Sequence, residues 1–133
     1  MEPKDYVEFC KVSESMDFAA IANRLSKVGT IRVLHAAMGM STEAGELLDA
    51  MKKHIFYGRD IDVVNLMEEH GDILWYAAIL ADAVGFTFED SFEKNIAKLR
   101  ARYPLQFDEL RAVQRDLARE RRVLEGSSEP DEI

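Results

Sequence analysis

Two pairs of carboxylates have the spacing of neighbours on a helix. Glu43 and Glu46 are three residues apart, and so are Glu69 and Asp72. Residues three apart on a helix share one face, with Cβ atoms about 5 to 6 Å apart. Each pair can therefore direct two carboxylates at one place. The ordinary alternative is that both pairs lie on solvated faces of amphipathic helices.

The neighbours of these carboxylates argue against a purely solvated role. At 100° per residue, the face of Glu43 and Glu46 also carries Ala36, Gly39 and Ala50, which would form a shallow groove. A face that meets only water would usually carry long polar side chains. We therefore expect this face to contact a ligand or another helix.

The second pair belongs to a stripe that becomes apolar along its length. Asn65, Glu69, Asp72 and Tyr76 follow one another on one helical face, which continues into aliphatic residues. Its carboxylates thus point along a buried direction. If the two helices face each other, four carboxylates converge in a partly dry space and repel one another, so a cation is needed there.

Hard divalent cations fit this set of ligands best. The candidate ligands are all oxygen, with no His or Cys at ligand spacing, and Mg²⁺ accepts a few carboxylates while keeping waters for a phosphate substrate. A di-iron bundle would need Glu-x-x-His motifs, which this sequence lacks.

Cationic and amide side chains recur on a later segment. Asn95, Lys98 and Arg102 fall at i, i+3 and i+7, opposite an apolar stripe that begins at Phe92. One face of this helix would pack in the core, and the other could hold phosphate oxygens. The alternative is an exposed basic stripe.

The hydrophobic pattern predicts an all-α fold. Clean alternation with β-branched residues is missing, whereas apolar spacings of three and four recur throughout. We expect helices near residues 6–10, 17–25, 30–54, 62–84, 87–102 and 108–124.

Two of these helices have distinctive surfaces. Residues 73–81, ILWYAAILA, are hydrophobic all round, and we therefore place them at the centre of the bundle. The last predicted helix has a narrow stripe of Leu110, Val113, Leu117 and Leu124 on a charged surface. Such a stripe packs on a neighbouring helix or on a partner subunit.

Length and charge bound the remaining possibilities. The 133 residues predict one domain, at 1–124, followed by a disordered tail at 125–133. The net charge of −8 argues against nucleic acid and anionic membranes as partners, although a local metal site would still admit a phosphorylated small molecule. The acidic start MEPKDYVEF has no signal-peptide pattern, and we expect a cytoplasmic protein.

Four motifs carry a resemblance to a known family. They are EAGE at 43–46, KKHIFYG at 52–58, EEHGDILWY at 68–76 and EKNIAKLRARYP at 93–104. Over about residues 30–104, the chain resembles the MazG-like all-α nucleoside triphosphate pyrophosphohydrolases, a superfamily that includes dimeric dUTPases and dCTP pyrophosphatases. The resemblance implies a four-helix-type bundle with extra N-terminal and C-terminal helices. It also implies hydrolysis of a nucleoside triphosphate to the monophosphate and pyrophosphate.

The resemblance also implies roles for individual residues. Mg²⁺, or Mn²⁺ in its place, would be held by Glu43, Glu46, Glu69 and Asp72, and Glu46 and Glu43 are the catalytic candidates, with Glu46 as general base. The candidates for phosphate binding are Lys53, Asn95, Lys98 and Arg102. The candidates for base recognition are His35, Trp75 and Tyr76, although aromatic residues on a central helix more often belong to the core.

The resemblance further suggests a homodimer or homotetramer whose sites draw on more than one subunit. A non-catalytic helical interaction or regulatory protein remains an alternative, as does a hydrolase of another pyrophosphate-containing nucleotide, such as a guanosine alarmone. Glu46→Gln separates the first alternative from an enzyme, because a binding module should be indifferent to it. Only a panel of substrates separates the second.

Overall fold

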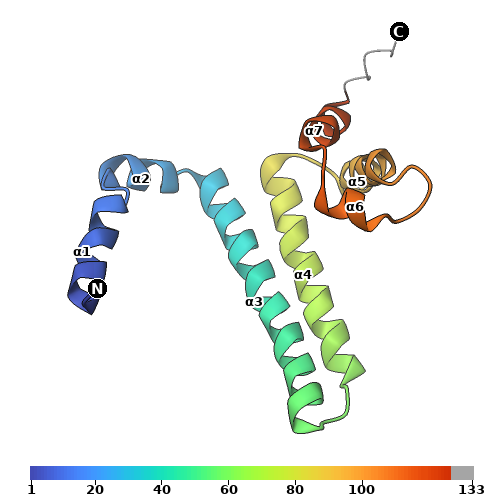
Figure 1. Cartoon of the computed structure of the whole chain (residues 1–133), viewed down its shortest axis with the longest axis horizontal. Coiled ribbons are helices and arrows are strands. Elements are labelled where there is room, and N and C mark those ends of the chain that lie inside the picture. Colours follow the sequence, from blue (N-terminus) through green and yellow to red (C-terminus); the bar gives the residue numbers. More distant parts are fainter. Residues whose placement is uncertain (127–133) are drawn as a thin grey trace. The chain divides into compact units, whose positions relative to one another are not determined.

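Every secondary-structure element within residues 1–126, the part of the chain that the computed structural model describes, is an α-helix (Figure 1). The predicted all-α class is therefore confirmed. The helices are α1 (Pro3–Ser13), α2 (Phe18–Leu25), α3 (Val28–Tyr57), α4 (Val63–Val84), α5 (Phe88–Arg102), α6 (Glu109–Val113) and α7 (Leu117–Glu125).

The chain divides into two units, Met1–Ala83 and Val84–Ile133. The single domain expected at residues 1–124 stays a prediction. Of the expected tail, Glu125 ends α7 and Gly126 caps it with a φ of 74°, and the rest lies outside the described residues. The structural description therefore treats each unit by itself.

Helix boundaries in the first unit follow local chemistry that the sequence displays. Asp17 caps α2 by accepting a hydrogen bond from the Ala20 amide at 3.0 Å. Gly58 ends α3 with a φ of 65°, a left-handed conformation that glycine adopts without a Cβ penalty. Asp62 accepts hydrogen bonds from the first amides of α4. Helix α3 runs from Val28 to Tyr57 and thus extends beyond the predicted 30–54 at both ends.

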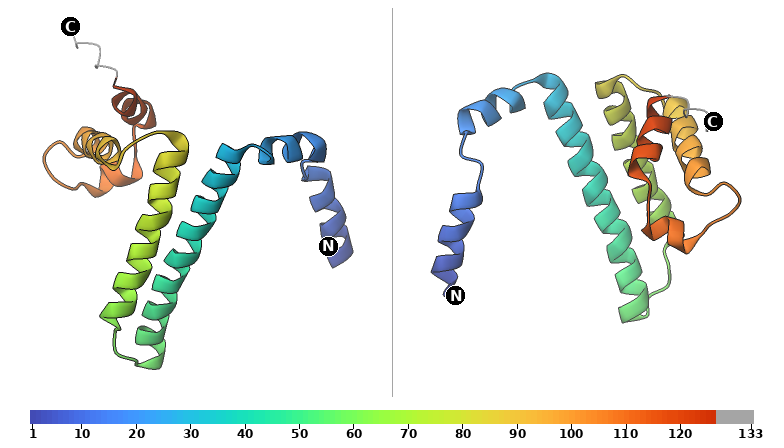
Figure 2. Two further views of the ribbon diagram at one scale, coloured as in Figure 1. Left: turned by 180° about the vertical axis from the view of Figure 1, so that it is seen from behind. Right: turned by 45° about the horizontal axis from the view of Figure 1, so that its top comes forward.

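Helices α3 and α4 run antiparallel and side by side, as Figure 2 shows from two further directions. Small residues line their contact: Ala36 is fully buried, Gly39 is buried, and Ala81 is 6% exposed. A Cβ added at Gly39 would overlap the ring of Tyr76 on α4. An ion pair between Arg32 and Asp82, at 2.5 Å, joins the helices near the start of α3. The hairpin therefore depends on small side chains at the contact.

The central position predicted for residues 73–81 stays a prediction, because the first unit by itself leaves part of this segment exposed. Leu74 is 47% exposed and Trp75 is 56% exposed, because α3 covers only one side of α4 within the unit.

Among the described residues, no helix taken alone has both the length and the apolar composition of a membrane span. Helices α4 and α5 would meet that criterion only as a pair with a break between them, by length and composition alone.

The second unit begins with a well-capped helix and ends with a broken one. Thr87 and Asp90 form a capping box at the start of α5, which matches the predicted start of that helix. The single helix expected at 108–124 is wrong, because the chain leaves the helix after Val113 and starts α7 at Leu117. Asp116 caps the new start by accepting from the Arg119 amide at 2.9 Å. The break interrupts the predicted apolar stripe.

Candidate metal centre

Three of the predicted carboxylates converge between α3 and α4. Glu43 on α3 and Glu69 and Asp72 on α4 each offer an oxygen, and these oxygens lie within 4.8 Å of one another. Glu43 and Glu69 are half-buried, and Asp72 is exposed at the rim. The two helices thus bring together residues that are far apart in the sequence.

The electrostatics of this cluster favour a cation. The pKa of Glu43 is raised above its usual value, first by desolvation and then by a hydrogen bond shared with Glu69. The negative charges of Glu69 and Asp72 raise it further, while a hydrogen bond from Thr42 acts in the opposite direction. A divalent cation would supply the positive charge that this cluster of carboxylates lacks. A donor set made only of carboxylate oxygens fits Mg²⁺ or Mn²⁺.

Two polar neighbours orient the cluster. Asn65 donates a hydrogen bond from Nδ2 to Glu69 Oε1 at 2.8 Å, one turn away on α4. The Thr42 hydroxyl donates to the Gly39 carbonyl at 2.8 Å and lies 3.3 Å from Glu43 Oε1. Such outer contacts hold ligating carboxylates in one orientation. Sequence spacing placed Asn65 on this stripe but gave no sign of Thr42.

Glu46 lies outside the converging group. Its side chain is exposed, and the cluster of ligand oxygens comprises Glu43, Glu69 and Asp72 without it. Glu46 follows Glu43 by one turn of α3, so it stays on the same helix face. Its roles as the fourth ligand and as general base remain predictions.

The three candidates for base recognition meet on the same helix pair. The ring centroids of Trp75 and Tyr76 are 4.9 Å apart, and those of His35 and Tyr76 are 5.5 Å apart. The rings meet edge to face, at interplanar angles of 81° and 84°. Tyr76 lies one turn beyond Asp72 on α4, so the aromatic group adjoins the carboxylate cluster.

The first phosphate candidate already has a partner. Lys53 forms an ion pair with Asp49 at 2.6 Å on the exposed face of α3, and Lys52 pairs with the same carboxylate. Hydrogen bonds from these two lysines lower the pKa of Asp49 to about 2. Asp49 therefore positions Lys53, and the phosphate role of Lys53 remains a prediction.

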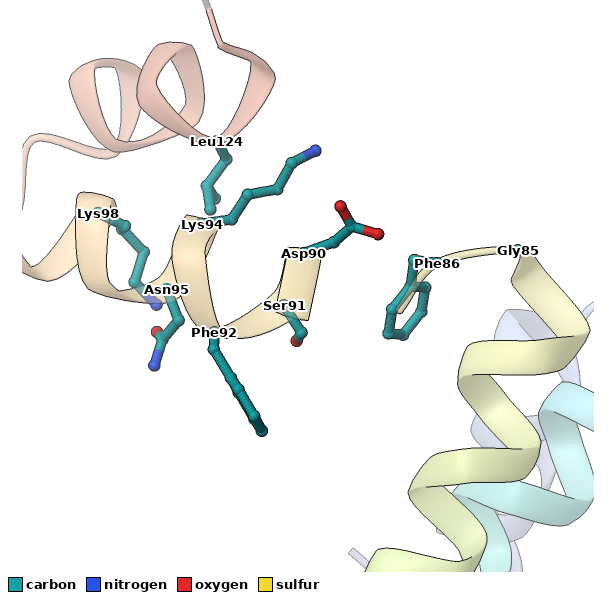
Figure 3. A pocket seen from close by; sticks show the side chains of 9 residues that line it. All are labelled: Gly85, Phe86, Asp90, Ser91, Phe92, Lys94, Asn95, Lys98 and Leu124. Atoms are coloured by element: carbon teal, nitrogen blue, oxygen red, sulfur yellow. The ribbon is translucent and has the colours of Figure 1, made fainter. Parts of the chain in front are cut away.

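Two other phosphate candidates line a hollow in the second unit. Asn95 and Lys98 belong to the wall of a hollow of about 770 Å³, together with Lys94 of the same helix (Figure 3). Phe92 and Leu124 add an apolar side to it. The structure thus groups Asn95 and Lys98, and it adds Lys94, which helical spacing did not single out.

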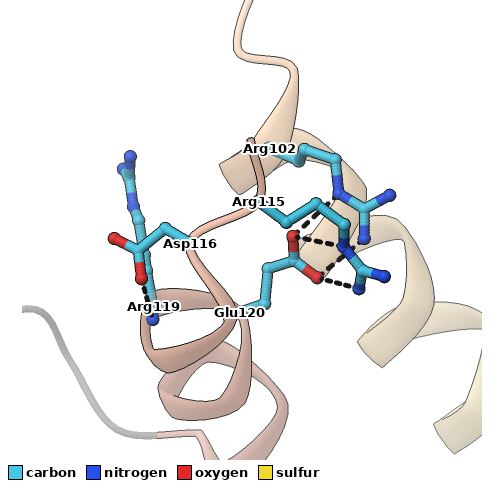
Figure 4. A network of polar contacts seen from close by, with 5 residues as sticks. All are labelled: Arg102, Arg115, Asp116, Arg119 and Glu120. Carbon is cyan, nitrogen blue, oxygen red and sulfur yellow. Dashed lines mark hydrogen bonds and ion pairs between the residues drawn. The ribbon is translucent and has the colours of Figure 1, made fainter. Parts of the chain in front are cut away.

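Arg102 is engaged elsewhere. Its Nε donates to Glu120 Oε1 at 2.8 Å, and its terminal nitrogen donates to Oε2 at 2.7 Å (Figure 4). The Arg102 side chain is only 15% exposed, and it is not part of the hollow that Asn95 lines. The sequence gave no sign of Glu120, because a contact across 18 positions has no local spacing pattern.

These features define an all-α protein with a carboxylate cluster suited to a hard divalent cation, beside a group of aromatic rings. The model of the MazG nucleotide pyrophosphohydrolase domain matches residues 33–107, which is more than half of the chain. The chain belongs to this family. The match agrees with the resemblance seen over about residues 30–104.

One curated relative is the Gene 37 protein of Mycobacterium phage L5. It is 33% identical over an alignment of 75 residues, and the match covers 51% of this chain and 63% of the phage protein. The similarity therefore spans less than two thirds of that relative. No solved structure matches the chain significantly.

Proposed function

We propose that the protein hydrolyses ribo- or deoxyribonucleoside triphosphates to the monophosphate and pyrophosphate, with Mg²⁺ or Mn²⁺ as cofactor. The observation that carries the proposal is the convergence of Glu43, Glu69 and Asp72, whose ligand oxygens lie within 4.8 Å of one another. Membership of the MazG nucleotide pyrophosphohydrolase family supports this class of reaction.

The carboxylates would hold the cation. Glu43, Glu69 and Asp72 would be its ligands, and Glu46 would complete the predicted set of four from the exposed side of α3. When bound, the cation would neutralise phosphate charge and lower the pKa of a bound water. Asn65 and Thr42 would keep the carboxylates oriented before substrate arrives.

Glu46 would act as the general base. Its exposed carboxylate has no partner that would compete with a water molecule among the described hydrogen bonds and ion pairs. It would accept a proton as the water oxygen bonds to the α-phosphorus. The bond from that phosphorus to the α–β bridging oxygen breaks, and pyrophosphate leaves with the bridging oxygen.

The aromatic group would receive the base. Trp75 and Tyr76 lie about one turn beyond Asp72 on α4, roughly 5 Å along the helix axis, and His35 of α3 meets both rings edge to face. That separation is compatible with a nucleotide whose phosphates lie at the carboxylates. Lys53 would contact phosphate oxygens, whereas a phosphate role for Asn95 and Lys98 of the second unit stays a prediction.

We also propose that the functional form is a homodimer or homotetramer. The exposed rings and aliphatic side chains of α4, with Trp75 at 56% and Met67 at 69% exposure, are more than a monomer in water usually leaves uncovered on its most apolar helix. A second copy of the chain would cover them. The molar mass measured by light scattering during size-exclusion chromatography tests this proposal, and a monomer mass at micromolar concentration would contradict it.

The decisive experiment supplies Mg²⁺ and a panel of ribo- and deoxyribonucleoside triphosphates in water enriched in ¹⁸O. We expect monophosphate and pyrophosphate as products, with the heavy oxygen in the monophosphate and complete loss of turnover in EDTA. Glu69→Gln and Glu46→Gln should abolish turnover while the fold is kept. Glu68→Gln is the matched control, because it changes an exposed neighbour of Glu69 that lies outside the cluster.

Other outcomes would redirect the assignment. Heavy oxygen in pyrophosphate would place the attack at the β-phosphorus and contradict the mechanism. If no triphosphate in the panel is hydrolysed but a guanosine alarmone is, the proposed substrate changes to another pyrophosphate-containing nucleotide. Silence toward both would favour a helical interaction protein.

A further inference from the structure

Helix α7 lies beyond residues 33–107, the segment that matches the family, and it packs against α5 within the second unit. A single carboxylate anchors this contact. Glu120 is 5% exposed and is the one charged residue that is buried within the described part of the chain. A buried carboxylate is tolerated only when its oxygens are fully paired, so its partners decide where α7 can lie.

Both oxygens of Glu120 are paired twice. In addition to the two bonds from Arg102, the terminal nitrogen of Arg115 donates to Oε2 at 2.6 Å, and its Nε donates to Oε1 at 3.3 Å (Figure 4). Arg102 comes from α5, and Arg115 comes from the break between α6 and α7. Two planar guanidinium groups therefore fix one carboxylate in position and orientation.

The same helix forms a wall of the hollow on α5. Leu124, one turn after Glu120, lines that hollow together with Lys94, Asn95 and Lys98 (Figure 3). The ammonium group of Lys98 forms no ion pair with any residue between 1 and 126. The hollow thus combines apolar side chains, including Leu124 of α7, with cationic and amide groups from α5. It is also lined by the carboxylate of Asp90, which already accepts two hydrogen bonds from Thr87. This lining suits a phosphorylated molecule with an apolar face.

We infer that α7 is a clasp in which Glu120 is a positioning residue. It holds Leu124 in the wall of the hollow on α5, where a phosphorylated ligand would bind, and Arg102 serves this clasp instead of contacting the phosphate of that ligand. The inference rests on the proposed function for the identity of the ligand. It adds a C-terminal element, outside the family match, that tunes substrate affinity.

The first test compares Glu120→Gln with Glu125→Gln. Both remove one negative charge from α7, but Glu125 pairs with Arg121 at an exposed position of the same helix. In Glu120→Gln we expect amide hydrogen exchange across residues 117–125 to rise about tenfold or more. The KM of the best substrate should rise about 10-fold to 100-fold with little change in kcat, the scale seen when supporting residues are lost. Glu125→Gln should match the parent in both.

A double-mutant cycle decides the role of Arg102. If Arg102 acts only through Glu120, then Arg102→Gln, Glu120→Gln and the double variant should raise KM by similar factors. If Arg102 contacts phosphate directly, Arg102→Gln would lose much more than Glu120→Gln, and the losses would multiply in the double variant. That result would overturn the inference, and so would unchanged exchange in Glu120→Gln.

A second variant keeps the inference testable if Glu120→Gln fails to fold. Leu124→Ala leaves the Glu120 contacts intact, and it should weaken nucleotide binding without raising hydrogen exchange in α7. Calorimetry with ATP in the absence of metal measures this binding even if the protein turns over no substrate. If Leu124→Ala binds ATP more weakly than the parent and the parent hydrolyses no substrate, the clasp is supported and the proposed function is contradicted. If Leu124→Ala binds ATP as tightly as the parent, the clasp is contradicted.

Discussion

The protein contains two contrasting glutamates, Glu43 in the first unit and Glu120 in the second. Glu43 meets two other carboxylates, and its pKa is raised, mainly by desolvation and by Glu69. Glu120 meets two arginines, and their hydrogen bonds lower its pKa to about 2. The same side chain therefore has opposite electrostatics in the two places.

The difference separates a binding site from a structural contact. Around Glu120 the protein supplies its own positive charge, so the carboxylate is satisfied without a ligand. Around Glu43 the protein supplies further negative charge, so the free energy of the folded state falls when a cation binds. Variants at the two positions should therefore respond in opposite directions.

The largest effect should come from the carboxylate cluster. Glu43→Gln should lower turnover about 100-fold or more, because it removes a predicted ligand of the catalytic cation. Without metal at pH 7, the same variant should be at least as stable as the parent. The raised pKa means that ionisation of Glu43 is disfavoured in the folded state, and glutamine removes that repulsion.

Urea unfolding in EDTA measures the stability of each protein without metal, and urea unfolding with Mg²⁺ in place of EDTA measures the gain from the ion. The parent should gain stability from Mg²⁺, by about 2.7 kcal/mol when the ion is at 100 times its Kd. A Glu43→Gln protein that is less stable than the parent in EDTA, or that gains as much from Mg²⁺, would contradict the comparison.

The contribution of Glu120 to the unfolding free energy should depend on pH. Its folded pKa of about 2 lies below the ordinary value of 4.5, so its stabilising contribution is complete above about pH 4.5. That contribution should fall as the pH drops from 4.5 toward 2. The difference in unfolding free energy between the parent and Glu120→Gln should therefore shrink over this range, whereas Glu125→Gln should show no comparable change. A difference that stays constant down to pH 2 would refute this account of the arginine pairing.

Glycines on α3 test the packing that brings the cluster together. Gly39→Ala should lower the unfolding free energy by about 1 to 3 kcal/mol, because the new Cβ would overlap the Tyr76 ring. Gly45→Ala on the same helix meets nothing within 4 Å and should raise stability by roughly 0.5 to 1 kcal/mol. Chemical denaturation measures both, and equal effects would show that the α3–α4 contact differs from the one described.

The smallest effect should come from outside the ligand set. Asn65→Ala removes the hydrogen bond to Glu69 and should weaken Mg²⁺ binding about 10-fold while leaving all the predicted ligands present. Calorimetric titration with Mg²⁺ provides the measurement. An effect as large as that of Glu43→Gln would mean that Asn65 contacts the ion or substrate directly.

Helix positions were largely predictable because their causes are local. The helices expected at 17–25, 62–84 and 87–102 correspond to α2, α4 and α5, and in the structure Asp17, Asp62 and Thr87 cap their starts. The break before α7 was missed because Leu110, Val113 and Leu117 continue a helical spacing across it. The spacing of apolar residues does not indicate where a capping residue such as Asp116 begins a new helix.

By itself, the sequence determined the helical class, the family, and the spacing that places Glu69 with Asp72 on one face of a helix. Helix geometry fixes such neighbours at every 3.6 residues, so no packing information is required. Only the tertiary structure decided that Glu43 joins that pair while Glu46 stays exposed, and that Arg102 meets Glu120. These contacts join separate helices, and they depend on which small side chains let two helices approach and on which charges must pair once they do.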